Sequence, residues 1–300
     1  METWRAFRGF DVIHCFVFPT PLTDLLLLAA RVRRQTVVLT DVGGGGACWS
    51  TYLGRIHPRL NLNRLAHGLA LLSEHSARAF TTWAQPKTVL HGGVNLQQFP
   101  VAATPPQGYA LFVGRLLPHK GVLQIIQAID GQTPLRIVGR PYDATYLAQL
   151  RDAASGKEVQ FILEADDAEL RRQYAGASVV LQPSLPSENA PSDTSELLGL
   201  VTLEAMACGK PVIVTRAGSL PELLVDGVTG YLIAPHDPVS LRTFITRLIS
   251  DANLSQAMGA AARRHVEAHF TWDQAARRGL AFYRTLAPSP TSQRGGTHQP

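Results

Sequence analysis

Six short apolar segments in the last two thirds of the chain constrain its fold most, because helical segments alternate with them. They are residues 109–113, 135–138, 159–162, 178–182, 211–215 and 230–233. Strands that alternate with helices form a parallel sheet with helices on both faces. We therefore predict an α/β fold with a doubly wound parallel sheet, in which ligands bind at the carboxyl ends of the strands.

The first third of the chain repeats this pattern in a shorter form. A helix is expected over 24–32, and the expected strands are residues 11–16, 36–40, 68–72 and 87–90. These strands predict part of a second parallel sheet. The Pro- and Ala-rich residues 100–108 are typical of a linker. We therefore expect a first domain over 1–99 and a second over 109–270, with a disordered tail over 287–300, which is rich in Pro, Ser, Thr and Gly.

Two glutamates eight residues apart, Glu196 and Glu204, frame the start of a predicted helix. Apolar residues recur at helical spacing over 200–208, and Gly209 ends the helix. Eight residues turn about 800°, roughly 80° off register, so the two glutamates do not share a helical face. Glu196 then lies in the loop before the helix and Glu204 in its second turn. Free N–H groups at a helix start opened by Gly199 suit an anion. The site would then offer a phosphate-binding helix start between two carboxylates. This arrangement suits a nucleotide sugar, which has hydroxyls at both ends and phosphate between them.

This segment resembles the E-x7-E signature of the retaining glycosyltransferases of family 4, the glycosyl transferases group 1. The likeness continues through Ala-Met-Ala-Cys-Gly-Lys-Pro-Val after Glu204, through Gly218-Ser-Leu-Pro-Glu-Leu and through Asp226-Gly-Val-Thr-Gly230. The resemblance implies the GT-B fold, in which two Rossmann-like domains face a cleft. Relatives begin earlier, so we expect an incomplete N-terminal, acceptor-side domain here. A last helix over 271–286 would cross back to that domain.

A second motif of the same family follows the first strand of the donor domain. Gly114-Arg-Leu-Leu-Pro-His-Lys-Gly121 resembles the pattern Gly-Arg-(x)4-Lys-Gly. Arg115 offers a planar fork for phosphate oxygens, and Lys120 offers a mobile point charge. The resemblance implies that both cations contact the donor phosphates. It also implies donor contacts from Gly114, Gly139, Leu198, Gly199, Leu200, Val201 and Glu204.

The resemblance assigns roles to the two carboxylates as well. Glu204 would hold the ribose hydroxyls, and Glu196 would hold the hydroxyls of the transferred sugar. We expect Glu196, Arg115 and Lys120 to be the catalytic residues of a hexosyltransferase that retains the anomeric configuration. The donor would be a UDP- or GDP-sugar, and the acceptor is left open between a glycan, a lipid-linked sugar and a small molecule. No cofactor and no metal are expected, because the chain contains no Asp-x-Asp motif.

Charge is uneven along the chain. The net charge of +5 falls entirely in residues 1–100, which hold ten Lys and Arg against five acids. This excess suits either contact with an anionic membrane or acceptor, or simply a solvated basic face. The arginines concerned are Arg31, Arg33, Arg34, Arg55, Arg59 and Arg64. Nucleic acid is not expected, since no recognised nucleic-acid module occurs.

Cysteine and apolar patterns bear on location. The three cysteines form no C-x-x-C pair, and the longest apolar run, residues 25–30, is too short to span a bilayer. We expect a cytoplasmic protein, with peripheral contact to the inner face of the membrane left open.

Two other functions are compatible with the sequence. A truncated N-terminal domain would leave a non-catalytic remnant that binds a nucleotide sugar but transfers nothing. A GT-B phosphorylase or epimerase is the other alternative, although none of the four lysines has the context of a pyridoxal phosphate site. Two loops are also ambiguous: the glycine run 43–46 is a hinge or a ligand loop, and the loop 185–195 is a lid or a surface insertion.

Overall fold

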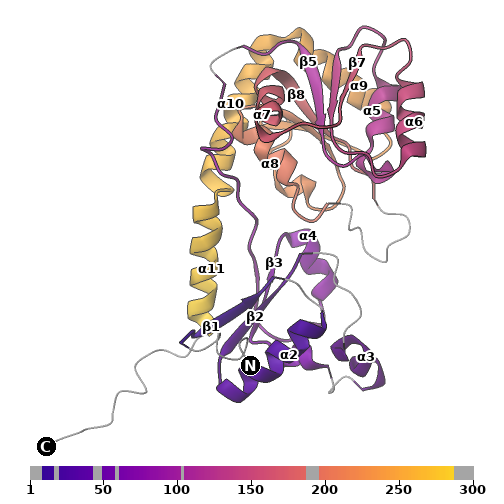
Figure 1. The fold of residues 1–300 in the computed structure, drawn as a ribbon. Coiled ribbons are helices and arrows are strands. Elements are labelled where there is room, and N and C mark those ends of the chain that lie inside the picture. Colours follow the sequence, from indigo (N-terminus) through magenta and orange to yellow (C-terminus); the bar gives the residue numbers. More distant parts are fainter. Residues whose placement is uncertain are drawn as a thin grey trace, which may run out of the picture. The chain divides into compact units, whose positions relative to one another are not determined.

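The computed structural model describes residues 9–16, 20–42, 49–57, 61–102, 105–186 and 196–286. The glycine run 43–46, all but the first two residues of the loop 185–195, and the tail 287–300 lie outside the described residues. The chain divides into two compact units. One comprises Met1–His91 with Ala275–Pro300, and the other comprises Gly92–Gln274. Each unit is an α/β structure with its own parallel sheet (Figure 1).

The sheet of the second unit has the strand order β10-β9-β8-β5-β6-β7, and all its neighbouring strands are parallel. The strands are β5 (Tyr109–Val113), β6 (Leu135–Val138), β7 (Val159–Ile162), β8 (Ala177–Gln182), β9 (Val212–Thr215) and β10 (Gly230–Ile233). The first strand of the unit therefore lies in the middle of the sheet, and the order runs outward from it in both directions. In such sheets the crevice for ligands lies where the direction reverses, here between β5 and β8.

Helices cover both faces of this sheet, as the alternation of its strand residues requires. Leu111 and Val113 of β5 belong to one apolar core, and Ala110 and Phe112 belong to the other. The first core also takes side chains from α7 (Asp167–Gly176), α8 (Leu200–Ala207) and α10 (Ala252–His269). The second takes side chains from α5 (Val122–Ala128), α6 (Ala144–Ala153) and α9 (Pro238–Ser250). Period-two alternation thus builds two cores from one set of strands.

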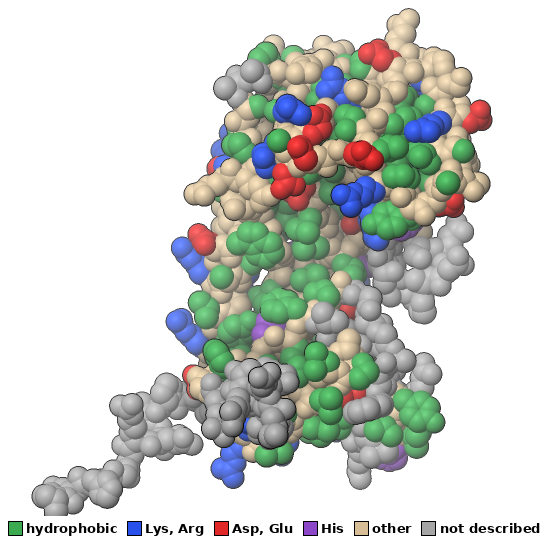
Figure 2. Space-filling model, in the orientation of Figure 1, with side chains coloured by type: hydrophobic (Ala, Val, Ile, Leu, Met, Phe, Trp, Pro, Cys, Tyr) green, Lys and Arg blue, Asp and Glu red, His purple; other side chains and the backbone are tan. Residues whose placement is uncertain are grey.

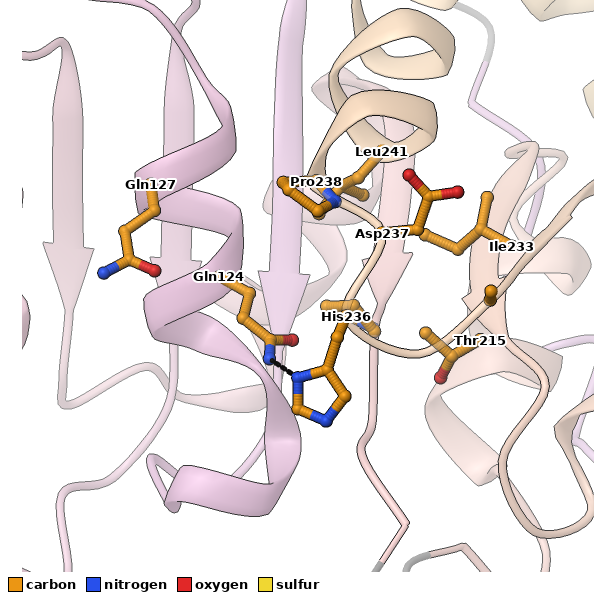
Figure 3. Close-up of a pocket in the computed structure, with 10 residues that line it drawn as sticks. Gln124, Gln127, Thr215, Ile233, His236, Asp237, Pro238 and Leu241 are labelled. Carbon is orange, nitrogen blue, oxygen red and sulfur yellow. Dashed lines mark hydrogen bonds between the residues drawn. The ribbon is translucent and has the colours of Figure 1, made fainter.

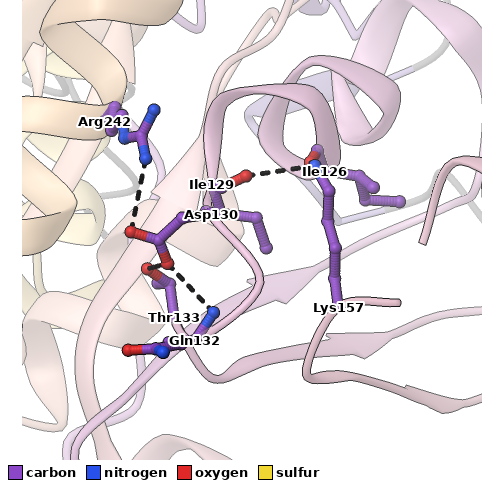
Figure 4. A network of polar contacts seen from close by, with 7 residues as sticks. All are labelled: Ile126, Ile129, Asp130, Gln132, Thr133, Lys157 and Arg242. Carbon is purple, nitrogen blue, oxygen red and sulfur yellow. Dashed lines mark hydrogen bonds and ion pairs between the residues drawn. The ribbon is translucent and has the colours of Figure 1, made fainter. Parts of the chain in front are cut away.

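A polar network secures the end of α5 before the chain enters β6 (Figure 4). The carboxylate of Asp130 accepts hydrogen bonds from the Thr133 hydroxyl at 2.7 Å and from Arg242 of α9 at 3.3 Å. Lys157 donates to the carbonyl oxygen of Ile129 at 3.0 Å. The Lys157 bond satisfies a backbone carbonyl where the helix ends, and the bonds of Asp130 link this segment to Thr133 and to α9. They lie at the amino end of the strands, the opposite edge from the predicted site.

The sheet of the first unit has four described strands in chain order, all parallel. They are β1 (Val12–Cys15), β2 (Thr36–Asp41), β3 (Gly68–Leu71) and β4 (Lys87–Val89). The helices of this unit are α2 (Pro21–Arg33), α3 (Trp49–Ile56), α4 (Glu74–Ala77) and most of α11 (Trp272–Leu286). One core lies between the sheet and α2, and Phe282 of α11 packs on the other face against Val38 and Ala70.

A half-buried histidine, His14, links the last helix to the first sheet. His14 Nδ1 lies 2.5 Å from the hydroxyl of Tyr283 in α11, and Nε2 lies 2.6 Å from Thr40 Oγ1. Burial lowers the pKa of His14 to about 4. The imidazole is therefore neutral at neutral pH and links β1, β2 and α11.

The boundary between the units falls earlier than we expected from the sequence. Residues 92–99, which we placed with the first domain, belong to the second unit. The N–H of Val94 donates to the carbonyl oxygen of Phe270 at 2.9 Å, and the ring of Phe99 contacts that of Tyr174 with centroids 5.9 Å apart. Val94 and Phe99 are buried, and the linker-like composition of residues 100–108, which follow them, does not reveal this.

Candidate functional site

The loops after β5 and β8 contact each other at the point where the strand order reverses. Gly121 has φ 73°, and a Cβ there would lie 2.1 Å from the carbonyl oxygen of Pro183. The N–H of Leu185 donates to the carbonyl oxygen of His119 at 2.7 Å. Only glycine permits this approach. The loop that carries Arg115 and Lys120 is therefore held against the segment after β8.

Two predicted donor-binding glycines lie beside each other at the neighbouring strand ends. The N–H of Gly114 donates to the carbonyl oxygen of Val138 at 3.0 Å. A Cβ on Gly139 would lie 1.8 Å from the carbonyl oxygen of Gly114. No side chain fits between these loops, so bare backbone borders the site here. Such backbone can approach a ligand closely.

Glu196 meets Lys120 at this edge. The carboxylate oxygen Oε1 of Glu196 accepts a hydrogen bond from Lys120 Nζ in an ion pair, and each side chain is 12% exposed. The buried hydroxyl of Ser184 donates to the same oxygen at 2.9 Å. Thr215 at the end of β9 donates its hydroxyl to the Ser184 carbonyl oxygen. Two of the three predicted catalytic residues are thus in direct contact.

The third predicted catalytic residue, Arg115, is exposed on the same loop. Among the described residues it forms no ion pair with Glu196 or Glu204. Its positive charge nevertheless affects the neighbouring His119. Burial lowers the pKa of His119, and the positive charges of Lys120 and Arg115 lower this pKa further. Two cations and a neutral histidine therefore share one short loop.

The backbone of Glu196 is anchored by the turn after β9. The N–H of Ser219 donates to the carbonyl oxygen of Glu196 at 2.8 Å. Gly218 has φ 54°, and a Cβ there would lie 2.2 Å from that same oxygen. The strand-end turn therefore fixes where Glu196 sits.

Helix α8 begins as the sequence predicted, with Gly199 as its N-cap at φ 65°. Glycine carries no side chain to cap the first N–H groups, which leaves them available to an anion. A Cβ at Gly199 would lie 2.6 Å from Leu223 Cδ1. Leu198 lies beside the backbone of Gly92, where a Cβ would come within 2.7 Å of Leu198 Cδ2. Close packing therefore dictates the path of the chain into α8.

Glu204 lies in the second turn of α8, apart from the contacts of Glu196. The fully buried Tyr174 of α7 donates its hydroxyl to Glu204 Oε2 at 2.9 Å. Burial raises the pKa of Glu204, the charge of Asp167 adds to this, and the Tyr174 hydrogen bond opposes it. Hence the two predicted carboxylates are held by different partners.

Two cavities border these strand ends. One of about 600 Å³ lies after β6 and β7 and is lined by Arg140, Pro141, Leu163, Glu164, Ala165 and Asp166. The other, of about 330 Å³, lies beside β8, β9 and β10 (Figure 3). There Gln124 Nε2 and His236 Nδ1 are 3.0 Å apart. This second cavity contains none of the predicted donor residues.

We did not predict from the sequence three residues that hold the site glutamates in place. Ser184, Tyr174 and Thr215 contact the glutamates or their support, yet we assigned them no role there. For Ser184 a signal existed, because it follows the carboxyl end of β8 almost directly, where ligand-facing residues gather. Tyr174 gave no such signal, since one tyrosine near the end of a helix is commonly a core residue.

Searches for metal sites and membrane helices covered the described residues. Within them no group of three or more His, Cys, Asp or Glu side chains could hold a metal ion. No helix in that part of the chain combines the length and apolar character needed to cross a bilayer.

Comparison with known sequences identifies relatives. Residues 96–265, which lie within the second unit, match the family model described as glycosyl transferases group 1. A D-inositol 3-phosphate glycosyltransferase of Corynebacterium diphtheriae is 33% identical over 195 residues, covering 61% of this chain and 43% of the relative. One of Streptomyces scabiei is 32% identical over 325 residues, covering 92% of this chain and 68% of the relative. The chain thus spans less than half of the first relative's length.

Solved structures share the fold. HepE of Anabaena, solved in complex with UDP, has a TM-score of 0.75 at 22% identity and covers 95% of this chain and 81% of its own. The sucrose-phosphate synthase of Thermosynechococcus elongatus has a TM-score of 0.71 at 23% identity and covers 95% of this chain and 76% of its own. With the two parallel-sheet units, this likeness confirms the predicted α/β, GT-B type of fold.

Proposed function

Because the chain belongs to the glycosyl transferases group 1 family, we propose that it transfers a sugar, a hexose, from a nucleotide diphosphate sugar to an acceptor hydroxyl. The observation that carries this proposal is the contact of Lys120 and Ser184 with Glu196 at the switch point of the donor sheet. A cation and a carboxylate beside the uncapped start of α8 match the phosphate and the sugar of such a donor.

The positive groups of the site act on the leaving group. Departure of the nucleoside diphosphate builds negative charge on its outer phosphate, while the anomeric carbon becomes cationic. Arg115, Lys120 and the N–H groups of residues 198–201 are fixed donors for that charge. Electrostatic stabilisation of this kind is worth about 3 kcal/mol for each donor. These groups supply the positive charge without a metal ion.

The carboxylates act on the two sugars of the donor. Glu196 accepts hydrogen bonds from hydroxyls of the transferred sugar and orients it, and Glu204 accepts from the ribose hydroxyls. Attack by the acceptor on the face that the leaving group vacates would retain the anomeric configuration. Glu196 needs no covalent bond to the sugar in this scheme, because the acceptor itself attacks the anomeric carbon on the face that the leaving group vacates.

The cavity after β6 and β7 is the proposed base pocket. It lies on the β6–β7 side of Gly139 and is lined by Arg140 and Leu163. We propose a UDP-sugar as the donor in preference to a GDP-sugar. The support is that HepE, whose fold this chain shares, was solved with UDP and with UDP-glucose. For the acceptor, a glycan, a lipid-linked sugar and a small molecule are equally compatible with this proposal.

We also propose peripheral contact of the first unit with an anionic membrane face. Helix α2 presents an exposed apolar stripe, formed by Leu22, Leu25, Leu28 and Val32, whose side chains are 43% to 75% exposed. Figure 2 shows hydrophobic side chains at the surface of this unit. Arg31 and Arg34 are exposed near the end of the helix, while its acidic residue, Asp24, is buried. An apolar stripe with basic neighbours suits the interface of an anionic bilayer, which supports our proposal that the transferase works at the cytoplasmic side of the membrane.

A donor-turnover assay tests the transferase proposal. The purified chain would be incubated with UDP-glucose, GDP-mannose or ADP-glucose in excess EDTA, and release of the nucleoside diphosphate would be followed. We expect turnover of one donor by transfer of its sugar to water, and the α-anomer of the free sugar should appear first by NMR when the donor is α-linked, before mutarotation. Binding of a donor with no release, even to water, would favour the non-catalytic alternative.

A further inference from the structure

We propose that the buried hydroxyls of Tyr174 and Ser184 are positioning residues of the donor site. Each fixes one oxygen of a site glutamate and leaves the other oxygen to the donor. The proposal rests on the proposed function, since it takes Glu204 as the ribose ligand and Glu196 as the ligand of the transferred sugar.

Tyr174 restrains Glu204 from one side. Its side chain is fully buried, and its hydroxyl donates only to Oε2, at 2.9 Å. The ring is itself locked edge-on against Phe99, with an interplanar angle of 81°. Among the described residues, none donates a hydrogen bond to Glu204 Oε1. A carboxylate with one oxygen held by a rigid partner presents the other in one direction, which lowers the cost of ordering it on binding.

Ser184 restrains Glu196 in the same manner. The residue is fully buried, and its hydroxyl donates to Oε1, which also accepts from Lys120. The carbonyl oxygen of Ser184 accepts a hydrogen bond from the Thr215 hydroxyl, which holds the backbone of Ser184 in place. No described residue donates to Glu196 Oε2. Within the described part of the chain, both carboxylates therefore have one oxygen that accepts a hydrogen bond and one that accepts none.

The electrostatics of Glu204 provide a readout that a purely structural tyrosine would not give. Burial raises the pKa of Glu204, Asp167 of α7 raises it further, and the Tyr174 hydroxyl lowers it. Cys208, the C-cap residue of α8, remains a neutral thiol because burial raises its pKa to about 12. Removing the Tyr174 hydroxyl should raise the pKa of Glu204 further. A protonated carboxyl is a weaker hydrogen-bond acceptor for the ribose hydroxyls. As the pH is lowered, the variant should therefore lose binding at a higher pH than the wild type does.

The first experiment compares Tyr174→Phe with Tyr109→Phe. Tyr109 is equally buried, and its hydroxyl donates to the Gln173 carbonyl oxygen at 2.7 Å without touching Glu204. UDP, GDP and ADP would be titrated calorimetrically into each full-length variant between about pH 5 and 8, across the range where a raised carboxyl pKa acts. We expect Tyr174→Phe to weaken nucleotide binding on the order of tenfold. We also expect the pH below which binding is lost to be higher in this variant than in the wild type. Tyr109→Phe should bind as the wild type does.

The second experiment compares Ser184→Ala with Ser255→Ala. Ser255 is also buried, and its hydroxyl donates to the Ser178 carbonyl oxygen at 2.6 Å, away from the glutamates. The readouts are nucleoside diphosphate affinity and the rate of nucleotide-sugar hydrolysis. Ser184 acts through Glu196, which we propose contacts only the transferred sugar. Ser184→Ala should therefore slow hydrolysis roughly tenfold and leave the affinity for the nucleoside diphosphate nearly unchanged. Ser255→Ala should alter neither.

The outcomes separate this proposal from the one it rests on. If the wild type binds a nucleoside diphosphate, Glu204→Ala abolishes binding, and Tyr174→Phe matches Tyr109→Phe in affinity and pH limb, the positioning role of Tyr174 is wrong while the donor site stands. Equal hydrolysis by Ser184→Ala and wild type removes the role of Ser184 in the same way. If the folded wild type binds none of the three nucleotides, both proposals fail together.

Discussion

Lys120 and Glu196, 76 residues apart in the chain, form an ion pair with each side chain only 12% exposed. The pair joins the loop after β5 to the loop before α8. It places the cation predicted for phosphate beside the carboxylate predicted for the transferred sugar. In a nucleotide sugar the outer phosphate and the transferred sugar are directly bonded, which is why we propose that this pair faces the bond between them.

This contact predicts how Glu196→Gln behaves. The amide keeps the shape of the side chain but removes the charge that Lys120 and the sugar hydroxyls meet. We expect transfer or hydrolysis to fall by on the order of 100-fold, with UDP affinity within a few-fold of wild type. Rate and affinity measured side by side check this. A proportionate loss of both would show that Glu196 holds the nucleotide instead.

Gly218 predicts a backbone effect on the same residue. A Cβ there would lie 2.2 Å from the Glu196 carbonyl oxygen, whereas Gly227, also at positive φ, has open space around it. Gly227→Ala should cost about 1 kcal/mol of unfolding free energy, the strain of φ alone, and keep activity. Gly218→Ala should cost more and lower turnover at least tenfold, because Glu196 must move. Denaturation and turnover assays of the pair test this, and equal behaviour of the two variants would contradict it.

His14 predicts a dependence of stability on pH. Its pKa is about 4 in the folded chain against 6.5 for the free side chain. Between these values the unfolded chain binds the proton and the folded chain does not, so unfolding free energy falls as the pH is lowered from 6.5 to 4. After a discount for partial exposure the loss is on the order of 2 kcal/mol.

The control for this prediction is His14→Gln. Other histidines with lowered pKa values, such as His67 and His119, act in the same direction but are common to both proteins. The difference between the two stability curves should therefore shrink toward pH 4. A difference independent of pH, or an NMR titration of His14 near 6.5, would contradict a buried neutral imidazole.

The stripe on α2 predicts binding to anionic vesicles. The wild type should sediment with phosphatidylglycerol-containing vesicles, and less so at high salt, but not with neutral phosphatidylcholine. The double variant Leu25→Ser, Leu28→Ser should lower partitioning at least tenfold. Val239→Ser, which changes a residue of α9 that is 74% exposed, is the control. If the double variant instead changes the oligomeric state and not vesicle binding, the stripe contacts protein.

Much of the fold could be predicted because its signals are local. The strands are short apolar runs at regular spacing, and the last helix, predicted over 271–286, is observed over Trp272–Leu286. We did not predict α6 (Ala144–Ala153), where Tyr146 and Leu150 are the buried residues of a mostly polar helix. Nor did we predict α3, since its range lies next to the glycine run and lacks an evident cap.

The site was less accessible to sequence reasoning because its contacts are long-range. Spacing predicted the helix start at Gly199 and the order of Glu196 and Glu204, but no spacing rule brings Ser184 onto Glu196 or Tyr174 onto Glu204. Those contacts depend on how β8 and α7 pack against α8, which follows from strand order. The early unit boundary at His91 has the same origin, in the long-range contact of Val94 with Phe270.

The most direct test of the donor site is calorimetric titration of the purified chain with UDP, GDP and ADP in EDTA. It would be run beside Arg115→Ala and Glu204→Ala, with the exposed Arg151→Ala of α6 as a charge-matched control. We predict tight binding of one nucleotide, UDP, that is lost or weakened at least tenfold in both site variants and kept in the control. Equal affinity in all four proteins, or no binding by a folded wild type, would contradict a nucleotide-sugar site at the ends of β5 and β8.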